Sequence, residues 1–306
     1  MLSLMDTKKN NRKVGSAALL LIASLIWGVS FVAQSAGMEH IGPFTFTAAR
    51  SLLAAVVLIP CFLLMDRLGW IPAADRRITW KAGIILGAIL FVGQNLQQVG
   101  ILYTSVAKAG FITSLYIVLV PIFGFLFHKR VHPALWLCAA IAIVGLYFLS
   151  IRDDFSVSLG DLLVLGCALV YTFHILVIDH YADRVDVVRM SCVQFLVCGA
   201  LSIPPALLLE QPTAGAIYAA RLPLLYAGVM SGCFAYTMQM LGQKNIEPTA
   251  ASLLLSPEAV FAALAGWVLL GQTLTGRELT GCALVMSAVV LSQLPWERWR
   301  LGRKRN

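Results

Sequence analysis

The chain has 306 residues, of which 59% are hydrophobic and only 12% are charged, and its mean hydropathy is +0.82. Soluble domains carry about 25% charged residues, so this composition excludes an ordinary soluble protein and is typical of a polytopic membrane protein. The net charge of +8 could suggest a nucleic-acid partner, but the positions of the cations indicate membrane topology instead.

Apolar runs of about 17–25 residues, separated by charged or Gly/Pro-rich breaks, predict ten membrane-spanning helices. In chain order they cover residues 15–35, 43–65, 81–102, 107–127, 133–150, 158–178, 187–208, 222–242, 248–270 and 276–294. The first run continues without a clear cleavage context, so we interpret it as a helix and not as a signal peptide. The predicted fold class is an all-α membrane protein.

The Lys and Arg residues predict the orientation of these helices. With the N-terminus inside, 18 of the 23 cations fall in inside segments, four fall in outside segments, and Arg50 alone lies within the membrane. Short inside loops of membrane proteins carry an excess of Lys and Arg. The distribution therefore predicts an even number of crossings, cytoplasmic N- and C-termini, and a basic cytoplasmic tail over residues 296–306.

The second half of the sequence repeats the first. Residues 15–32 align with residues 160–177, and Pro121 in the fourth span matches Pro257 in the ninth. Because each repeat has five spans, an odd number, the second repeat must enter the membrane from the opposite side. Inverted repeats of this kind are typical of secondary transporters. The predicted repeats cover residues 12–150 and 158–295.

Pro121 and Pro257 are expected to break their helices. A proline in mid-helix removes one amide donor and frees the carbonyl four residues earlier, which is that of Leu253 for Pro257. We interpret the break as shared by both repeats. Glu258 has no acidic counterpart, because Ile122 occupies the matching position.

Arg50 and Glu258 are the two charged residues well inside predicted spans, and both lie within a turn or two of the midplane. A carboxylate in hydrocarbon costs roughly 2.5–3.5 kcal/mol, so it should face protein or a water-filled cavity. Three interpretations are open: a structural ion pair between the repeats, a role in substrate or proton binding, or an Arg50 side chain that reaches the outer surface.

Polar and aromatic residues in several spans could line a central cavity. The amides of the third span could bond between helices or form a polar cavity wall. His174 is the only histidine clearly inside a span, and it could be structural or a proton site. The candidate substrate-binding or coupling residues are Glu258, Arg50, Trp27, Gln34, Gln94, Asn95, Gln98, Tyr116, His174 and Tyr236.

Motifs for catalysis or nucleotide binding are missing from the sequence. It contains no GxSxG, HExxH, Walker A or Rossmann glycine pattern, so we expect neither an enzyme nor a primary active transporter, and no cofactor. The seven cysteines fall in apolar runs without a CxxC spacing. His174, Asp179 and His180 do not have a metal-ligand spacing, so no metal is expected. A membrane-embedded enzyme or scaffold remains a remote alternative.

Several motifs extend over essentially the whole chain: Trp27-Gly-Val-Ser-Phe31, and residues 49–54, 97–105, 108–121, 256–261 and 269–275. Together they resemble EamA-type transporters of the drug/metabolite transporter superfamily. The resemblance implies ten helices in inverted repeats, a central cavity and alternating access, in the inner membrane of a bacterium. One departure is Gln272, where members often carry Glu.

The expected function is secondary transport of a small metabolite, such as an amino acid, or of an amphiphilic drug. We expect an exporter embedded in the lipid bilayer, with protons as a candidate coupling ion and no nucleic-acid partner. The alternative is a facilitator or importer of a small solute in which Arg50 and Glu258 form a purely structural pair.

Overall fold

The structure is a computed structural model that describes residues 2–68, 74–104, 106–126, 131–150, 158–271 and 273–294. Side chains are described for these residues except 2–11, 106–107, 126, 150 and 270. Every regular element in this part of the chain is a helix, which confirms the all-α prediction. Gln272 and the predicted tail at 296–306 lie outside the described residues.

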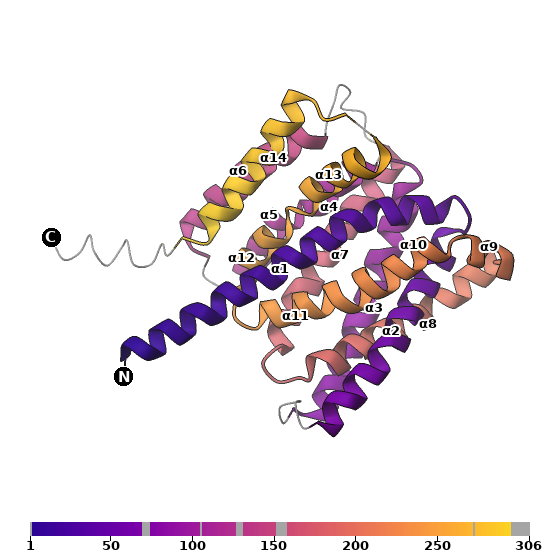
Figure 1. The fold of residues 1–306 in the computed structure, drawn as a ribbon, viewed down its shortest axis with the longest axis horizontal. Coiled ribbons are helices and arrows are strands. Elements are labelled where there is room, and N and C mark those ends of the chain that lie inside the picture. The colour runs from indigo at the N-terminus through magenta and orange to yellow at the C-terminus, as the bar shows by residue number, and fades with distance from the viewer. Residues whose placement is uncertain are drawn as a thin grey trace.

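Helices of the first half largely follow the predicted spans. They are α1 (Leu2–Met38), α2 (Pro43–Arg67), α3 (Arg76–Ile101), α4 (Val106–Ser114), α5 (Tyr116–Leu126) and α6 (Pro133–Ser150). The predicted fourth span is therefore two short helices. The first turns of α1 reach beyond the rest of the bundle (Figure 1).

The second half divides in the same manner, and two of its predicted spans are interrupted. Its helices are α7 (Leu159–Tyr181), α8 (Val187–Leu209), α9 (Ala214–Ala219), α10 (Arg221–Leu225), the π-helix η1 (Tyr226–Ala235), α11 (Tyr236–Gln243), α12 (Pro248–Leu255), α13 (Glu258–Leu270) and α14 (Gly276–Ser292). The eighth predicted span contains the π-helix, and the ninth is α12 followed by α13.

Eight helical segments among the described residues are long and apolar enough to cross a membrane, and Pro133–Leu149 is a shorter apolar helix. The last helix, α14, has 17 residues. At 1.5 Å per residue, 17 residues extend about 26 Å, slightly less than a bilayer core of about 30 Å. The structure thus supports a multi-pass membrane protein, and ten crossings stay a prediction.

The two broken helices differ in where the break falls. In the second half it lies at Ser256 and Pro257, and the carbonyl of Leu253 accepts a hydrogen bond from the Ser256 hydroxyl at 2.8 Å. In the first half it lies at Leu115, whereas Pro121 is inside α5. This differs from the break expected at Pro121. A proline frees the carbonyl four residues earlier, which is that of Ile117 for Pro121, so Pro121 does not by itself account for a break at Leu115.

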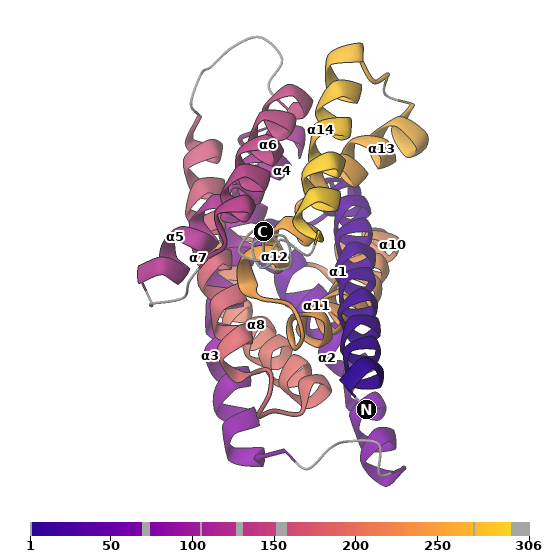
Figure 2. The same ribbon diagram turned by 90° about the vertical axis from the view of Figure 1, so that its left-hand side faces the viewer.

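Helices α6 and α14 lie side by side at one edge of the bundle (Figures 1 and 2). They touch at two glycines: a Cβ built on Gly145 would lie 2.8 Å from the Gly281 carbonyl oxygen, and one on Gly281 would lie 2.5 Å from the Gly145 carbonyl oxygen. Gly145 also faces Val285, and Gly281 faces Leu149, so the helices run antiparallel.

Helices α2 and α8 are also antiparallel and are tied together along their length. At the start of α2, the Glu210 carboxylate that follows α8 accepts hydrogen bonds from the backbone N–H groups of Phe44 (2.8 Å) and Thr45 (2.7 Å). Near the middle, Gly199 lies against Leu52. Corresponding helices of the two halves thus run in opposite directions where they touch.

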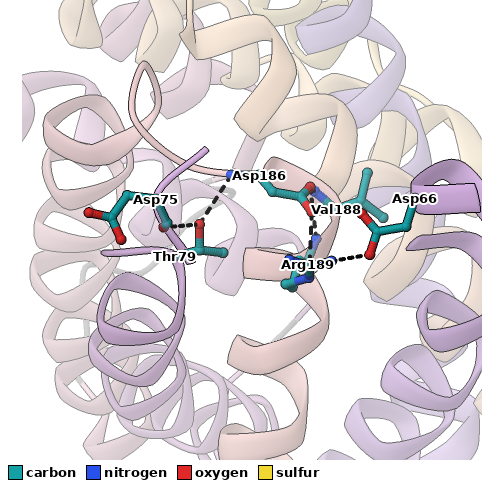
Figure 3. A network of polar contacts seen from close by, with 6 residues as sticks. All are labelled: Asp66, Asp75, Thr79, Asp186, Val188 and Arg189. Atoms are coloured by element: carbon teal, nitrogen blue, oxygen red, sulfur yellow. Dashed lines mark hydrogen bonds and ion pairs between the residues drawn. The ribbon is translucent and has the colours of Figure 1, made fainter. Parts of the chain in front are cut away.

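A polar network at the other end of this pair also includes α3 (Figure 3). Arg189 in the first turn of α8 forms an ion pair with Asp66 of α2. Asp186 caps α8, and its backbone N–H donates to the Thr79 hydroxyl of α3 at 3.2 Å. Thr79 in turn donates to the carbonyl oxygen of Asp75, the N-cap of α3. The network fixes the ends of three helices relative to one another.

Helix α13 lies directly against α1 because Gly28 has no side chain. A Cβ at this position would lie 2.7 Å from the carbonyl oxygen of Glu258 and 2.8 Å from the amide nitrogen of Ala262. The close approach places Glu258, the first residue of α13, beside the part of α1 that carries Trp27. It therefore brings candidate residues from both halves together.

Candidate functional site

A cavity lies between the two halves of the chain, and the empty space in and around it, including space open to solvent, is about 540 Å³. The wall is built from nine of the helical segments. Its residues are Trp27, Phe31, Gln34, Arg50, Gln97, Tyr116, Tyr171, His174, Ile175, Ser231, Tyr236, Gln239, Leu255 and Glu258.

Seven of the ten candidate residues lie in this wall, and three do not. Those in the wall are Trp27, Gln34, Arg50, Tyr116, His174, Tyr236 and Glu258. Those outside it are the three amides of α3, namely Gln94, Asn95 and Gln98. Positions far apart in sequence and in both repeats therefore converge on one space.

The three amides of α3 are not among the residues that line the cavity, and two of them bond to neighbouring helices. Gln94 donates to the Tyr236 hydroxyl oxygen at 3.4 Å, and Asn95 donates to the Ser202 hydroxyl at 3.2 Å. Gln98 is fully buried. Because α3 is packed between α7 and α8, only one strip of its surface is open to the cavity, and Gln97 occupies it. Of the two interpretations that the sequence leaves open for these amides, bonding between helices is the one that the hydrogen bonds of Gln94 and Asn95 favour.

Glu258 connects the breaks of the two halves. Its side chain is 5% exposed, and its Oε1 accepts a hydrogen bond from the Tyr116 hydroxyl at 3.1 Å and from the Ser114 hydroxyl at 3.5 Å. Ser114 ends α4 and Tyr116 begins α5, while Glu258 begins α13. Carboxyl and hydroxyl groups from the two repeats therefore meet in the cavity wall.

Arg50 lies in the same wall without pairing with Glu258. The residue is 5% exposed, which rules out a side chain that reaches the surface. Its guanidinium lies 5.5 Å from the centre of the Phe46 ring, and its Nε has no hydrogen-bond partner among the described residues. No ion pair joins Arg50 to Glu258 in the described part of the chain. The two side chains are therefore not paired with each other, and Glu258 is held by Tyr116 and Ser114 instead.

Aromatic rings form one side of the cavity, with Tyr236 at their centre. Trp27 lies 4.8 Å from the Tyr236 ring centre, and His174 lies 5.8 Å from it, both in edge-to-face geometry. Phe195 packs on the same ring from outside the wall at 5.2 Å. Edge-to-face pairs of this kind stabilise a fixed arrangement of rings.

Several polar atoms of the wall make no hydrogen bond within the described residues. Trp27 Nε1 and Arg50 Nε are donors, and Gln34 Oε1 and Gln239 Oε1 are acceptors. A buried polar atom without a partner costs about 1–3 kcal/mol. In the wall of a cavity, such atoms can bind a polar ligand. The arrangement favours a ligand with both accepting and donating groups.

Part of the wall was not among the sequence candidates. Helical spacing alone places Phe31 on one face with Trp27 and Gln34, and Gln239 one turn from Tyr236, although neither was selected as a candidate. Ser231 lies in the π-helix, where that spacing does not hold. Among the described residues, no group of three or more His, Cys, Asp or Glu side chains could hold a metal.

Both halves of the chain resemble one known family. Residues 15–151 and 158–294 each match the EamA-like transporter family. The chain belongs to that family. The two matched segments lie close to the predicted repeats, and the resemblance to EamA-type transporters is confirmed.

Two similar proteins are named as uncharacterized transporters. An uncharacterized transporter of Archaeoglobus fulgidus is 32% identical over 258 residues, covering 83% of this chain and 77% of the relative. The uncharacterized transporter YoaV of Bacillus subtilis is 22% identical over 262 residues, covering 82% and 87%. A crystal structure with 20% identity has a TM-score of 0.76 over 93% of this chain and 98% of its own, and it supports the fold alone.

Proposed function

We propose that this EamA-like transporter moves a small zwitterionic metabolite, such as an amino acid or a related compound, across the inner membrane. The observation that supports this proposal is the unpaired placement of Arg50 and Glu258 in one cavity wall. Arg50 would bind the carboxylate of the substrate, and Glu258 would bind its ammonium group. Each of the two side chains would thus pair with an oppositely charged group of the substrate and not with the other side chain.

A zwitterion fits this cavity better than an amphiphilic drug does. A drug without an anionic group would leave the buried guanidinium of Arg50 without a counter-charge, and a buried unpaired charge is unfavourable. A small zwitterion would also use the free atoms of Trp27, Gln34 and Gln239. The aromatic rings would hold its apolar side chain.

Transport would proceed by alternating access, with the broken helices as the moving parts. The hydrogen bonds of Glu258 to Tyr116 and Ser114 join the breaks of the two halves across the cavity. A proton or an ammonium group on Glu258 would compete with these bonds. We therefore propose that Glu258 couples export to the proton gradient.

The test is transport of labelled zwitterions by purified protein in liposomes with an imposed pH gradient. We expect Arg50→Gln to abolish transport, and Glu258→Gln to abolish its dependence on the pH gradient and to weaken exchange without a gradient, because the carboxylate that would bind the ammonium group is lost. Glu39→Gln is the matched control, because Glu39 is exposed at the end of α1 and lies outside the wall. Profiling of culture medium after overexpression would identify the solute and its direction.

Three outcomes would count against the proposal. If no solute changes in liposomes or medium, transport of a zwitterion is refuted. If transport runs inward or without a gradient effect, the protein is an importer or a facilitator that uses the same cavity. If both single variants lose stability equally and the double variant recovers it, Arg50 and Glu258 act only as a structural pair.

A further inference from the structure

His174 in the cavity wall has one hydrogen-bond partner among the described residues, the buried side chain of Gln194 on α8. The Nε2 atom of His174 lies 3.1 Å from Oε1 of Gln194, and the two residues are 2% and 0% exposed. Gln194 is not part of the wall. It lies behind His174, where it can act on the substrate only through the imidazole ring.

The backbone of Gln194 is held by α3. A Cβ built on Gly87 would lie 2.7 Å from the Gln194 carbonyl oxygen and 2.6 Å from Cβ of Val197. On its other side, the His174 ring stands edge-to-face with Tyr236 at 89°. The glutamine and the imidazole are thus both oriented by close packing, so their hydrogen bond has a defined geometry.

The chemistry of the two groups decides which ring nitrogen carries the proton. A neutral imidazole has one N–H donor and one lone pair, and an amide oxygen only accepts. In the arrangement that the structure has, Oε1 of Gln194 faces Nε2, which places the proton on Nε2 and the lone pair on Nδ1; the amide nitrogen of Gln194 then has no hydrogen-bond partner among the described residues. Nδ1 makes no hydrogen bond to any residue that the structure describes.

We propose that Gln194 is a positioning residue that holds His174 in the Nε2–H form, so that Nδ1 is an acceptor for a donor group of the substrate. This deepens the proposed function and rests on it. His174 then joins Glu258, Gln34 and Gln239 as acceptors in the wall, against the donors Arg50 and Trp27. The reversed amide would make His174 a donor and would favour a second anionic group in the substrate.

The tautomer can be measured without transport. Protein labelled with ¹⁵N in its histidine rings is placed in lipid nanodiscs, and the His174 signals are identified by their loss in His174→Gln. We expect a protonated Nε2 and an unprotonated Nδ1. Gln194→Met keeps a similar volume but removes the strong acceptor, so it should give a mixture of tautomers. Gln194→Glu restores the acceptor and should restore the Nε2–H form.

Transport kinetics supply the second readout. Gln194→Met should raise KM for the zwitterion about tenfold, the effect of one hydrogen bond, with Vmax within about twofold. Gln194→Glu should recover most of this loss. Gln243→Met is the matched control, because Gln243 is a buried glutamine that donates to the Ile175 carbonyl of α7 at 3.4 Å and does not bond His174. In the Gln243→Met protein, the His174 tautomer and the KM for the zwitterion should equal those of the unmodified protein.

Several results would overturn the proposal. A protonated Nδ1 in the unmodified protein would show that the amide is reversed. A Gln194→Met protein with altered tautomer and unchanged KM would show that His174 does not contact the substrate. If Gln194→Met does not fold, Gln194→Glu must still show the Nε2–H signal. Failure of the zwitterion proposal itself is distinct, since Arg50→Gln and Glu258→Gln would then leave transport unchanged while the NMR result stands.

Discussion

At the scale of single residues, Gly28 decides how closely the two halves approach at the cavity. The backbone of α13 passes so near that any Cβ at position 28 would lie 2.5–2.8 Å from atoms of Phe261, Glu258 and Ala262. Two of those atoms belong to the backbone, which cannot turn aside as a flexible side chain can. The position of the Glu258 carboxyl group thus depends on a residue that has no side chain.

Gly28→Ala should therefore destabilise the protein by about 1–3 kcal/mol, as overpacking does, and should reduce transport by displacing Glu258 from Tyr116. Thermal unfolding in detergent and transport in liposomes measure the two effects. Gly15→Ala in the same helix is the control, because no atom lies within 4 Å of a Cβ there. Equal behaviour of the two variants would contradict the close approach of α13.

At the scale of elements, α2, α3 and α8 form one unit that is fixed at several levels. Arg189 and Asp66 join α8 to α2 at one end, Glu210 joins them at the other, and Asn95 joins α3 to α8. In contrast, α4–α5 and α12–α13 are interrupted near the cavity. We expect the unbroken unit to stay rigid while the broken helices move.

Arg189→Met should cost about 1–3 kcal/mol of stability, because it leaves Asp66 and Asp186 without their cation. Its effect on KM should be small, since Arg189 lies outside the cavity wall. In a double-mutant cycle with Asp66→Asn, the two changes should be strongly non-additive. Arg67→Met, at an exposed position next to Asp66, is the control, and additive effects would argue against the ion pair.

The sequence predicted the positions of the helices better than it predicted which side of each helix faces the cavity. Charged residues in apolar runs were informative, because the cost of a charge in hydrocarbon requires Arg50 and Glu258 to face a protected space. An amide in hydrocarbon costs less than a charge and can form hydrogen bonds between helices. The sequence pattern therefore could not show that Gln97 lines the cavity while Gln94 does not, because this depends on which helices pack against each side of α3. The interruption at Leu115 and the π-helix at Ser231 depend likewise on tertiary contacts.

For the whole molecule, the orientation in the membrane is the main prediction to test. The distribution of Lys and Arg predicts that Arg67 lies on the cytoplasmic side of the membrane, and the segment that contains Gly215 should then lie on the outer side. In a Cys61→Ser background, Gly215→Cys should react with a membrane-impermeant maleimide in intact cells. Arg67→Cys should react only after the membrane is permeabilised. The reverse pattern would invert the topology and with it the assigned direction of export.

The contact of α6 with α14 has a consequence for how the chain is joined. Each helix ends its own half, and the two meet backbone to backbone at Gly145 and Gly281. Helices α2 and α8 form a second contact between the halves, through an ion pair and a hydrogen bond. The peptide link between the halves is therefore not what holds them together. Two separate polypeptides, divided between residues 150 and 158 and made in the same cell, should assemble and co-purify through a tag on either one.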